Sequence, residues 1–446
     1  MISYEQQLDR IWPAMVEGSV TATDGVSARV ACLPVPIGAE VELQRVGLPA
    51  LSAQVIGFHD GLTHVFPFEE PRGVRIGDRV RLVRTQPTFR VGPQLLGRVL
   101  DAKGRSLDGR PAPTALSVAC LEAAPPRALQ RRSIREPLAT GVRVIDGLLT
   151  CGAGQRSAIV AGPGLGKSVL LGMLARRSEA DVNVVALIGE RGREVQEFLD
   201  RDLRDGLQRS VVIVATGDES AAMRLRAAMA ATTVAEYFRE QGLRVQLLFD
   251  SLTRVAMAQR EIGLSLGELP ASRGYPPSVY SLLPRLLERT GASDQGSITA
   301  FYSVLVDELG RDDPIGEAAR GLLDAHYVLC PRLAQRGLYP AIDVLDSVSR
   351  LMPQVADPDH AADAAAVRNA LAAKREAEDL IMVGAYRAGS RADVDAALRC
   401  EHQLDSFRRQ SPDESSSPEV TRKQLRELAR SLADERLESR GLPTNP

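Results

Sequence analysis

The chain is 446 residues long and 44% of its residues are hydrophobic, so it has enough apolar side chains to bury more than one core. Its 55 lysines and arginines nearly balance its 57 aspartates and glutamates. This balance argues against a surface that collects nucleic acid or anionic lipid by charge alone. We therefore expect two or three domains and no nucleic-acid partner.

Cysteine usage and hydropathy favour a protein made for a reducing compartment. The cysteines are odd in number, lie far apart and form no CxxC pair (Cys32, Cys120, Cys151, Cys330 and Cys400). The first residues lack the basic start and apolar stretch of a signal peptide, and no later run of about 18 uncharged apolar residues could span a bilayer. We expect a cytoplasmic protein that contacts membranes only through partners.

Turn signals divide the first part of the chain from the rest. In the first 85 residues, short Val- and Leu-rich runs alternate with turn dipeptides such as Asp24-Gly25 and Asp60-Gly61, which is typical of a small barrel or sandwich. The sequence therefore predicts an all-β domain over residues 1–85. A connector rich in glycine and proline follows and opens the second domain, which we place at residues 86–352.

The second domain has the pattern of an α/β core. Between Ser157 and Val304, apolar runs alternate with helix-like segments, and the runs read SAIVA, NVVALIG, VVIVA, VQLLFD and ITAFYSV. Such an alternation favours a parallel sheet with helices on both faces.

The last part of the chain is predicted to be helical. After Met352 the strand pattern ends, and alanine-rich segments of mixed charge predict three helices, over residues 363–383, 392–407 and 420–438. We expect a helical domain over residues 353–446, with a flexible break at Ser411–Val420.

The first apolar run of the core leads into a phosphate-binding motif. Gly-Pro-Gly-Leu-Gly-Lys-Ser follows the strand and an apolar helix start comes next, as phosphate binding requires. Lys167 would reach the β and γ oxygens of ATP, and Ser168 would ligate Mg²⁺. Ala161 replaces the first glycine of the strict motif, and Pro163 removes one N–H donor. We assign nucleotide binding to Gly162, Gly164, Leu165, Gly166, Lys167, Ser168 and Val169.

Two other strand ends carry carboxylates. Glu190 follows an apolar run and could orient the attacking water; the alternative is a solvated charged turn. Asp250 ends another run, as a Walker B carboxylate that meets Mg²⁺ directly or through water; the alternative is helix capping by Asp250 or Ser251. Combined with Lys167 and Ser168 in one sheet, these carboxylates predict an Mg²⁺-dependent ATPase.

Several blocks together resemble the superfamily of F-type ATP synthase subunits and type III secretion ATPases. The resemblance covers roughly residues 15–400, including VGPQLLGRVLDAKGRSLDG, REPLATGVRVIDGLL and PAIDVLDSVS. GERGREVQEF, DSLTRVAMAQREIGLSLGE, SRGYPPSVYSLLPRLLERTG and GSITAFYSVL are similar to the export branch rather than the synthase β subunit, and the last leans towards the injectisome type. The resemblance implies a RecA-like P-loop core behind an N-terminal β-barrel and ahead of a C-terminal helical domain.

The resemblance also implies roles for single residues. It agrees with the phosphate, Mg²⁺ and water-orienting roles given above, and it adds Arg191 beside Glu190 in the catalytic set. Arg350 would be an arginine finger presented to the neighbouring subunit's ATP. Tyr339 would pack on adenine, for which a core position is the alternative.

An arginine that acts on a neighbour requires a ring, so the resemblance implies a homohexamer with a central pore. Gly267–Pro277 and Val306–Glu317 would face this pore. The chain departs from the family at Leu269, where a proline is usual, and at Leu309-Gly310, where an acidic pair is usual. Cys330-Pro331 stands near the subunit interface in place of Ser-Arg. The two departures in the pore-facing segments concern substrate handling and leave the catalytic residues intact.

The function implied by the resemblance is ATP hydrolysis that powers type III protein export by unfolding substrates, releasing chaperones and turning a central stalk. The implied partners are a central stalk, a stator or peripheral stalk, the export gate and sorting platform, and secreted effectors with chaperones, at the cytoplasmic face of the inner membrane. Alternatives are a flagellar export ATPase, a rotary F/V-type synthase subunit, a catalytically silent ring subunit and a Rho-like nucleic-acid motor. The last is disfavoured because only 4% of residues are aromatic.

Overall fold

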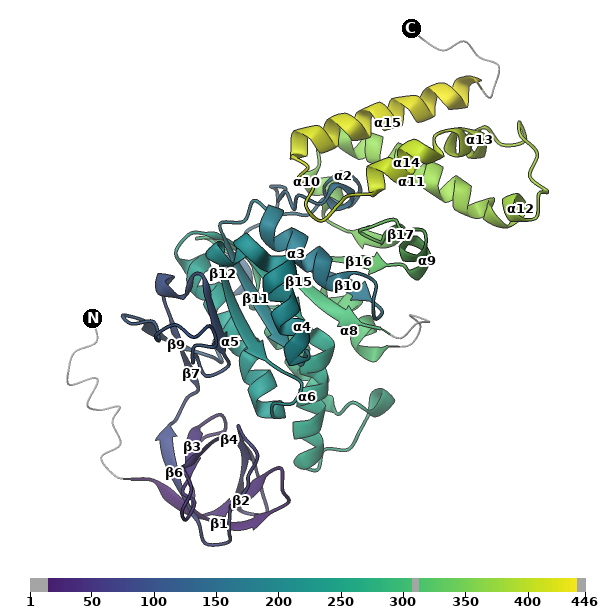
Figure 1. Ribbon diagram of the computed structural model, residues 1–446. Helices are drawn as coiled ribbons and strands as arrows, with labels where there is room; N and C mark the ends of the chain where they lie inside the picture. Colours follow the sequence, from purple (N-terminus) through teal and green to yellow (C-terminus); the bar gives the residue numbers. More distant parts are fainter. Residues whose placement is uncertain (1–14, 307–312, 439–446) are drawn as a thin grey trace.

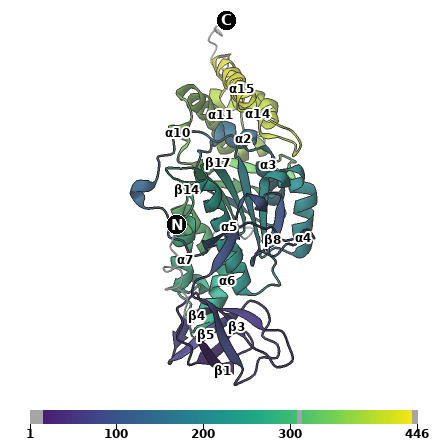
Figure 2. The same ribbon diagram turned by 90° about the vertical axis from the view of Figure 1, so that its left-hand side faces the viewer.

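The computed structural model describes residues 15–306 and 313–438, which form three units along one long axis (Figure 1). A β-barrel lies at one end, a helix-covered sheet in the middle and a group of helices at the other end (Figures 1 and 2). The predicted fold class is thereby confirmed. None of the helices within these ranges combines the length and apolar character that a membrane crossing requires.

Six strands close into the N-terminal barrel in the order β1-β2-β5-β4-β3-β6. Along β4 every second residue is buried from Leu51 to Gly57, as the two-residue repeat of a strand dictates. Closure leaves the sheet without an exposed edge. The strands are β1 (Glu17–Thr23), β2 (Ala28–Ala31), β3 (Glu40–Leu43), β4 (Leu51–His59), β5 (Leu62–Pro67) and β6 (Arg79–Arg84).

The central sheet has the order β17-β16-β10-β15-β13-β11-β12-β8, with β14 paired to β15. All pairs are parallel except β16 with β17 and β14 with β15. Every residue of β11 and β12 is buried, as expected for strands covered on both faces. The strands are β8 (Arg98–Asp101), β10 (Arg156–Ala161), β11 (Val182–Ile188), β12 (Ser210–Ala215), β13 (Arg244–Asp250), β14 (Gly291–Ala292), β15 (Ser297–Leu305), β16 (Ala325–Leu329) and β17 (Ile342–Ser349).

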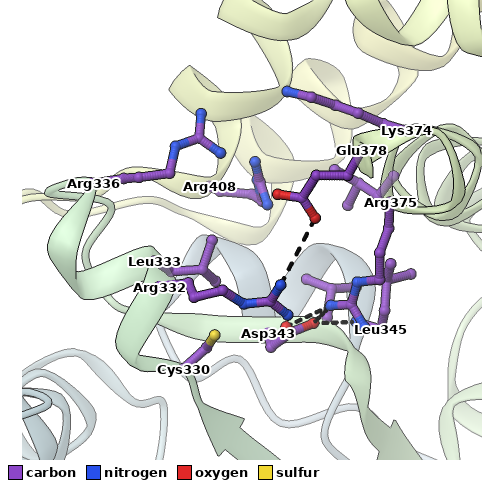
Figure 3. A pocket seen from close by; sticks show the side chains of 12 residues that line it. Cys330, Arg332, Leu333, Arg336, Asp343, Leu345, Lys374, Arg375, Glu378 and Arg408 are labelled. Carbon is purple, nitrogen blue, oxygen red and sulfur yellow. Dashed lines mark hydrogen bonds and ion pairs between the residues drawn. The ribbon is translucent and has the colours of Figure 1, made fainter. Parts of the chain in front are cut away.

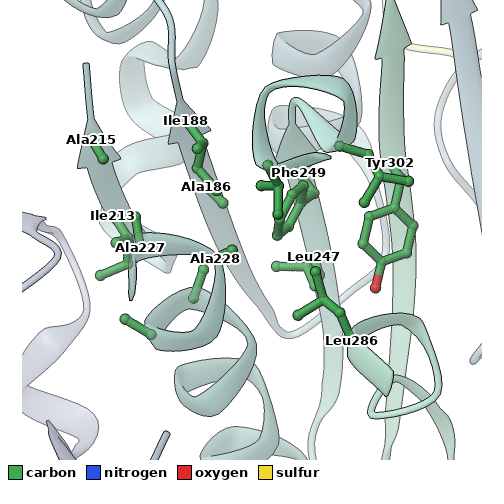
Figure 4. Packing of buried hydrophobic residues seen from close by; sticks show 14 of the residues in the cluster. Ala186, Ile188, Ile213, Ala215, Ala227, Ala228, Leu247, Phe249, Leu286 and Tyr302 are labelled. Carbon is green, nitrogen blue, oxygen red and sulfur yellow. The ribbon is translucent and has the colours of Figure 1, made fainter. Parts of the chain in front are cut away.

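Helices cover both faces of this sheet and create two apolar layers. In the first, Ala227 and Ala228 of α5 pack close to the sheet beside Ile213 (Figure 4). Leu170 of α3 belongs to the second layer, on the opposite face. The helices are α3 (Lys167–Arg177), α4 (Gly192–Glu197), α5 (Ala221–Glu240), α6 (Leu252–Ser265), α7 (Pro277–Leu287), α8 (Pro314–Leu322) and α9 (Pro331–Gln335), with shorter turns η1 (Pro93–Leu95), η2 (Ala128–Gln130), η3 (Phe198–Leu203), η4 (Arg204–Arg209) and η5 (Ser272–Gly274).

The connector between barrel and core contributes a strand to the central sheet. β8 runs parallel to β12, whereas β7 (Thr88–Val91) pairs with β9 (Ser117–Cys120) in a separate ribbon. Arg98 fixes the loop after β8 by donating to Asp108 at 2.7 Å from Nε and 3.0 Å from Nη2. β8 is not predicted from the sequence, because the strand has only four residues and turn residues lie on both sides of it.

The C-terminal helices pack against the core through α2 (Arg143–Leu148). Gly147 of α2 lies so close to Phe407 that a Cβ atom at Gly147 would be 2.7 Å from the ring. Two of the three predicted helices are interrupted, at Ala377 and at Cys400. The helices are α10 (Met352–Val355), α11 (Pro358–Glu376), α12 (Glu378–Met382), α13 (Ala392–Arg399), α14 (Glu401–Arg408) and α15 (Pro418–Glu438).

The segment predicted as a flexible break is partly helical. Its last three residues, Pro418–Val420, form the start of α15, so the prediction is wrong there. Proline is preorganised for the first turn of a helix, and the Ser417 hydroxyl accepts the Val420 N–H at 3.3 Å.

Ion pairs join the sheet edge to the helical domain around a small cavity (Figure 3). Arg375 of α11 is directed at Asp343 of β17, and Arg332 of α9 lies 3.7 Å from Glu378 at the start of α12. Asp343 is buried. A buried carboxylate needs a charged partner, so the first pair fixes α11 against β17.

A buried arginine joins the connector, α5 and the end of α7. Arg289 donates from Nε to Glu236 at 2.9 Å, and from Nη1 to the carbonyl oxygen of Leu121 at 2.7 Å.

We expect Arg289→Met to lower the free energy of unfolding by about 3–5 kcal/mol, because it leaves the buried carboxylate of Glu236 unpaired. Urea unfolding followed by circular dichroism measures this. Arg285→Met, at an exposed site on α7, is the control, and equal unfolding midpoints for the two variants would contradict the prediction.

Candidate active site

The carboxyl ends of three parallel strands bring the predicted site residues together. β10, β13 and β11 lie in one sheet, with β15 between β10 and β13. Leu187 of β11 pairs with Asp250 of β13, so Glu190, two residues past the end of β11, lies near Asp250. Lys167 approaches both carboxylates from the start of α3.

The phosphate-binding loop connects β10 to α3 through left-handed glycines. Gly164 and Gly166 have φ values of 75° and 84°, a conformation that glycine adopts without strain. Gly162 directly follows β10, and Leu165 packs against the second apolar layer. The first helical turn begins at Lys167, and Ser168 and Val169 within it are exposed. The first N–H groups of a helix have no partner inside the helix and carry positive potential, which suits phosphate.

Lys167 forms a buried ion pair with Asp250. Its Nζ lies 2.6 Å from Asp250 Oδ1 and 3.5 Å from Glu190 Oε1. Burial alone would lower the pKa of Lys167, but the charges of Asp250 and Glu190 raise it, so the ammonium stays protonated. Asp250 also accepts the Ser303 hydroxyl at 2.5 Å.

Glu190 is poised between its two protonation states near neutral pH. Burial, together with the negative charge of Asp250, raises the pKa of Glu190 to about 7, and Lys167 only partly opposes this. Oε1 of Glu190 is buried and has Lys167 Nζ as its ion-pair partner at 3.5 Å. A carboxylate with this pKa is suited to orient water and accept its proton.

The structure decides the capping alternative for Asp250. The hydroxyl of Ser251 accepts the N–H of Arg254 at 3.3 Å, so Ser251 caps α6. Asp250 is directed instead to Lys167 and Ser303. Asp250 is therefore a site carboxylate and not a helix cap.

Two residues at the site are missing from the sequence predictions. Ser303 of β15 meets Asp250 because β15 neighbours β13, a sheet order that the sequence does not contain. Glu194, in the first turn of α4, forms a side-chain hydrogen bond with Glu190 that lowers the pKa of Glu194. The only sequence signal for Glu194 is its position four residues after Glu190, in Glu190-Arg-Gly-Arg-Glu194.

Tyr339 lies beside the phosphate-binding loop, and Arg191 points away from the carboxylates. A Cβ atom placed on Gly166 would be 3.6 Å from the Tyr339 ring, which is 41% exposed. The Arg191 side chain is 88% exposed and lies 3.9 Å from Glu194. The structure thus leaves the Tyr339 ring available to a base and places the Arg191 side chain in solvent beside Glu194.

Arg350 is at the opposite edge of the sheet from the phosphate-binding loop of its own chain. Ser349, before it, pairs with Ala325 at the amino end of β16, which pairs with Ser157 at the amino end of β10. The length of β10, at about 3.3 Å per residue, separates these edges by roughly 17 Å. Arg350 is exposed and donates to the carbonyl oxygen of Arg320 at 3.2 Å.

The residues present fit an Mg²⁺ ion that arrives with a nucleotide. Mg²⁺ prefers oxygen ligands and is usually held by one or two carboxylates together with substrate phosphates. Ser168 and Asp250 supply a hydroxyl and a carboxylate at the edge where the phosphates would lie. Among the described residues, no group of three or more His, Cys, Asp and Glu side chains could hold a metal without such help.

The segments predicted to face a pore are only partly described. Leu269, between α6 and α7, is 82% exposed. Leu309-Gly310 falls in residues 307–312, outside the described ranges. Cys330, next to Pro331 at the start of α9, is buried beside the ion pairs of Figure 3.

Comparisons with known proteins agree with the fold. Residues 141–349 match the model of the ATP synthase alpha/beta family, nucleotide-binding domain. Residues 356–427 match the T3SS EscN ATPase C-terminal domain. Fold, site and matches define a P-loop ATPase with the ATP synthase type of nucleotide-binding domain.

Two curated relatives come from different export branches. The type 3 secretion system ATPase of Xanthomonas euvesicatoria is 48% identical over 91% of this chain and 92% of its own. The flagellum-specific ATP synthase of Bacillus subtilis is 48% identical over 82% of this chain and 83% of its own. The chain therefore belongs to the family of type III secretion and flagellar export ATPases.

Solved structures of EscN, from the type III secretion system of enteropathogenic E. coli, resemble the chain closely. The assembled ATPase EscN is 41% identical, with a TM-score of 0.88. EscN in complex with its central stalk EscO is 40% identical, with a TM-score of 0.85. Each alignment covers 92% of this chain and 100% of that chain.

The pKa of Glu190 leads to a pH prediction. If deprotonated Glu190 is required, kcat/KM for ATP should fall about tenfold per pH unit below about pH 7. Glu194→Gln should move this acid limb to lower pH, because the hydrogen bond and charge of Glu194 raise the pKa of Glu190. Steady-state rates between about pH 5.5 and 8 measure both. A flat profile, or a limb that Glu194→Gln moves upward, would contradict the assignment.

Proposed function

We propose that the chain hydrolyses ATP to power protein export through a type III secretion apparatus, as a homohexamer whose active sites are completed between subunits. The observation that carries this proposal is the division of the predicted site. Lys167, Glu190 and Asp250 gather at one edge of the sheet, and Arg350 lies at the other. In a ring, the far edge of one subunit can face the nucleotide of the next.

The proposed chemistry is transfer of the terminal phosphoryl group to water. The N–H groups of the loop and of the first turn of α3 bind the phosphates, and the Lys167 ammonium stabilises the negative charge on the β and γ oxygens. Ser168 and Asp250 would hold Mg²⁺, which when bound neutralises phosphate charge. Glu190 orients the water and accepts its proton. Arg350 of the adjacent subunit stabilises the charge that develops on the transferred group.

The solved structures of EscN support two of the proposed partners. EscN has been solved assembled and with its central stalk EscO, which supports a homohexameric ring and a central stalk for this chain. We further propose a stator or peripheral-stalk partner, the export gate, a sorting platform, and secreted effectors with their chaperones. The work is chaperone release, substrate unfolding and stalk rotation, at the cytoplasmic face of the inner membrane through these partners.

The two export branches remain alternatives. The secretion relative and the flagellar relative are both 48% identical to this chain, so the assignment to the injectisome type stays a prediction. A pulldown of the tagged chain from native cells tests it. Recovery of injectisome components supports the lean, and recovery of flagellar components overturns it.

A silent ring subunit and a synthase subunit are less well supported. A silent subunit does not need a water-orienting carboxylate, whereas Glu190 is present beside Lys167. The helical domain matches the EscN C-terminal model, which favours export over synthesis.

Glu190→Gln should separate binding from turnover. Glutamine keeps the size of the side chain but cannot accept the proton of water, so hydrolysis should fall by at least about 100-fold while ATP still binds. Malachite-green phosphate release and binding of a fluorescent ATP analogue measure the two properties. Gln196→Ala, at an exposed site on α4, is the control. Normal turnover in Glu190→Gln would remove Glu190 from this role.

Arg350 should act on the neighbouring subunit. Arg350→Ala should abolish most hydrolysis, because an arginine finger raises the rate roughly 10³- to 10⁵-fold. Lys167→Ala should do the same, because it removes the ammonium from the β and γ oxygens. Mixing the two variants should restore part of the activity, since some interfaces then combine an intact Lys167 with an intact Arg350. Mixed wild-type and doubly substituted chains control for subunit exchange. If exchange occurs without rescue, a role in trans is ruled out.

A further inference from the structure

One buried glutamine connects the helical domain to the predicted base site. Gln410, two residues after α14, is 2% exposed. Its backbone N–H donates to the carbonyl oxygen of Tyr339 at 2.8 Å. Its side chain accepts the N–H of Arg143 and donates to the carbonyl oxygen of Gly141, both at 2.8 Å. Gln410 therefore links the residue next to the phosphate-binding loop with the start of α2.

The segment around Gln410 also touches the far end of the helix that begins at the phosphate-binding loop. Arg176 and Arg177, at the end of α3, donate to the carbonyl oxygens of Pro412 and Asp413 at 2.9 Å and 2.7 Å. Arg143 forms an ion pair with Glu414. Residues 409–414, which we call the strap, thus contact α3, α2 and Tyr339.

The strap and Tyr339 share one cavity. Tyr339, Gln410, Ser411 and Pro412 line it, with Arg143 and residues of α14. Tyr339 thus lies between this cavity and the phosphate-binding loop, because its ring is also next to Gly166.

We propose that Gln410 positions Tyr339 beside the phosphate-binding loop and so couples binding of the nucleotide base to the helical domain. The inference rests on the proposed function, since it assumes that ATP binds at this loop. Gln410 acts through Tyr339 and is a positioning residue. Four hydrogen bonds fix it: the backbone bond to Tyr339, and side-chain bonds with Arg143, Gly141 and, at 3.1 Å, the carbonyl oxygen of Glu414. The side-chain bonds hold the strap in place behind Tyr339, so a displacement of Tyr339 is passed to the end of α14.

A competing route would run through the phosphates. In that case α3 would report phosphate binding to the strap through Arg176 and Arg177. Those two contacts are partly exposed, and exposed arginine contacts are weaker than buried ones. A ligand with phosphates but no base separates the two routes, and inorganic tripolyphosphate is such a ligand.

The first test measures affinity. Gln410→Ala should weaken binding of a non-hydrolysable ATP analogue by about 5-fold or more, at the lower end of coupling between sites, and leave tripolyphosphate binding unchanged. Combined with Tyr339→Ala, it should add little further loss, because the two residues act in one unit. Gln403→Ala, exposed on α14, is the matched control. Equal losses for both ligands, or additive effects of the two substitutions, would overturn the proposal.

The second test observes the helical domain by hydrogen exchange, which reports local opening. In the wild-type chain the ATP analogue should slow exchange in α3 and in α14 and α15, whereas tripolyphosphate should slow it in α3 alone. In Gln410→Ala the analogue should act as tripolyphosphate does. Protection of α14 by tripolyphosphate would show that the phosphate route carries the coupling and would overturn the base route.

Two controls keep the outcomes distinct. If neither ligand protects α3 in the wild-type chain, the proposed function fails rather than the role of Gln410. If Gln410→Ala does not give a cooperative unfolding transition, Gln410→Met preserves the buried volume while removing the same side-chain hydrogen bonds. An unchanged preference for the ATP analogue in Gln410→Met would then overturn the proposal.

Discussion

The ion pair between Lys167 and Asp250 is the contact on which the nucleotide site depends. It joins the start of α3 to the end of β13, two strands away from β10, and only a parallel sheet places those ends together. Both groups are largely buried, and a buried charge is costly without a partner of opposite charge. One ammonium faces two carboxylates, however, and the second, Glu190, lies in a buried position beside the negative charge of Asp250. Burial first and the charge of Asp250 second raise the pKa of Glu190 to about 7.

The polarity of the sheet also explains why the site is incomplete in one chain. Residues that follow parallel strands gather at the carboxyl edge, whereas β17 runs in the opposite direction. Its first residues therefore carry Tyr339 to the carboxyl edge, and its last residue leaves Arg350 at the amino edge. A single reversed strand thus places Tyr339 beside its own chain's phosphate-binding loop and leaves Arg350 exposed at the other edge, as the proposed ring requires.

Sequence patterns predicted five strands of the central sheet, β10, β11, β12, β13 and β15, and the strand–loop–helix order around Lys167, because both depend on local signals. Glycines in a turn, a lysine at the helix start and apolar β-branched runs are visible without the fold. The interruptions at Ala377 and Cys400 were missed because alanine-rich helices carry no local stop signal there. Strand β8 was missed because it is short and lies among turn residues.

Contacts across the sheet could not be predicted in the same way. Ser303 meets Asp250, and Glu190 lies near Lys167, only because the strand order is β10-β15-β13-β11, which no residue spacing encodes. The roles of Arg350 and Tyr339 came from the family resemblance. Their positions at opposite edges became intelligible only with the direction of β17.

Under the proposed function, different parts of the ring bind different parts of ATP. The phosphates belong to the sheet edge, the base to Tyr339 and the strap, and the terminal phosphoryl group also to Arg350 of the neighbour. Cleavage separates only the terminal phosphoryl group, so the charge of the ligand next to Lys167 and Glu190 changes first while the base keeps its contacts. The contact between Arg350 of the neighbouring subunit and the nucleotide should therefore weaken before the contact between the base and the helical domain. Such an order would give the ring a direction, since each subunit would release its neighbour while its own helices still respond to bound ADP.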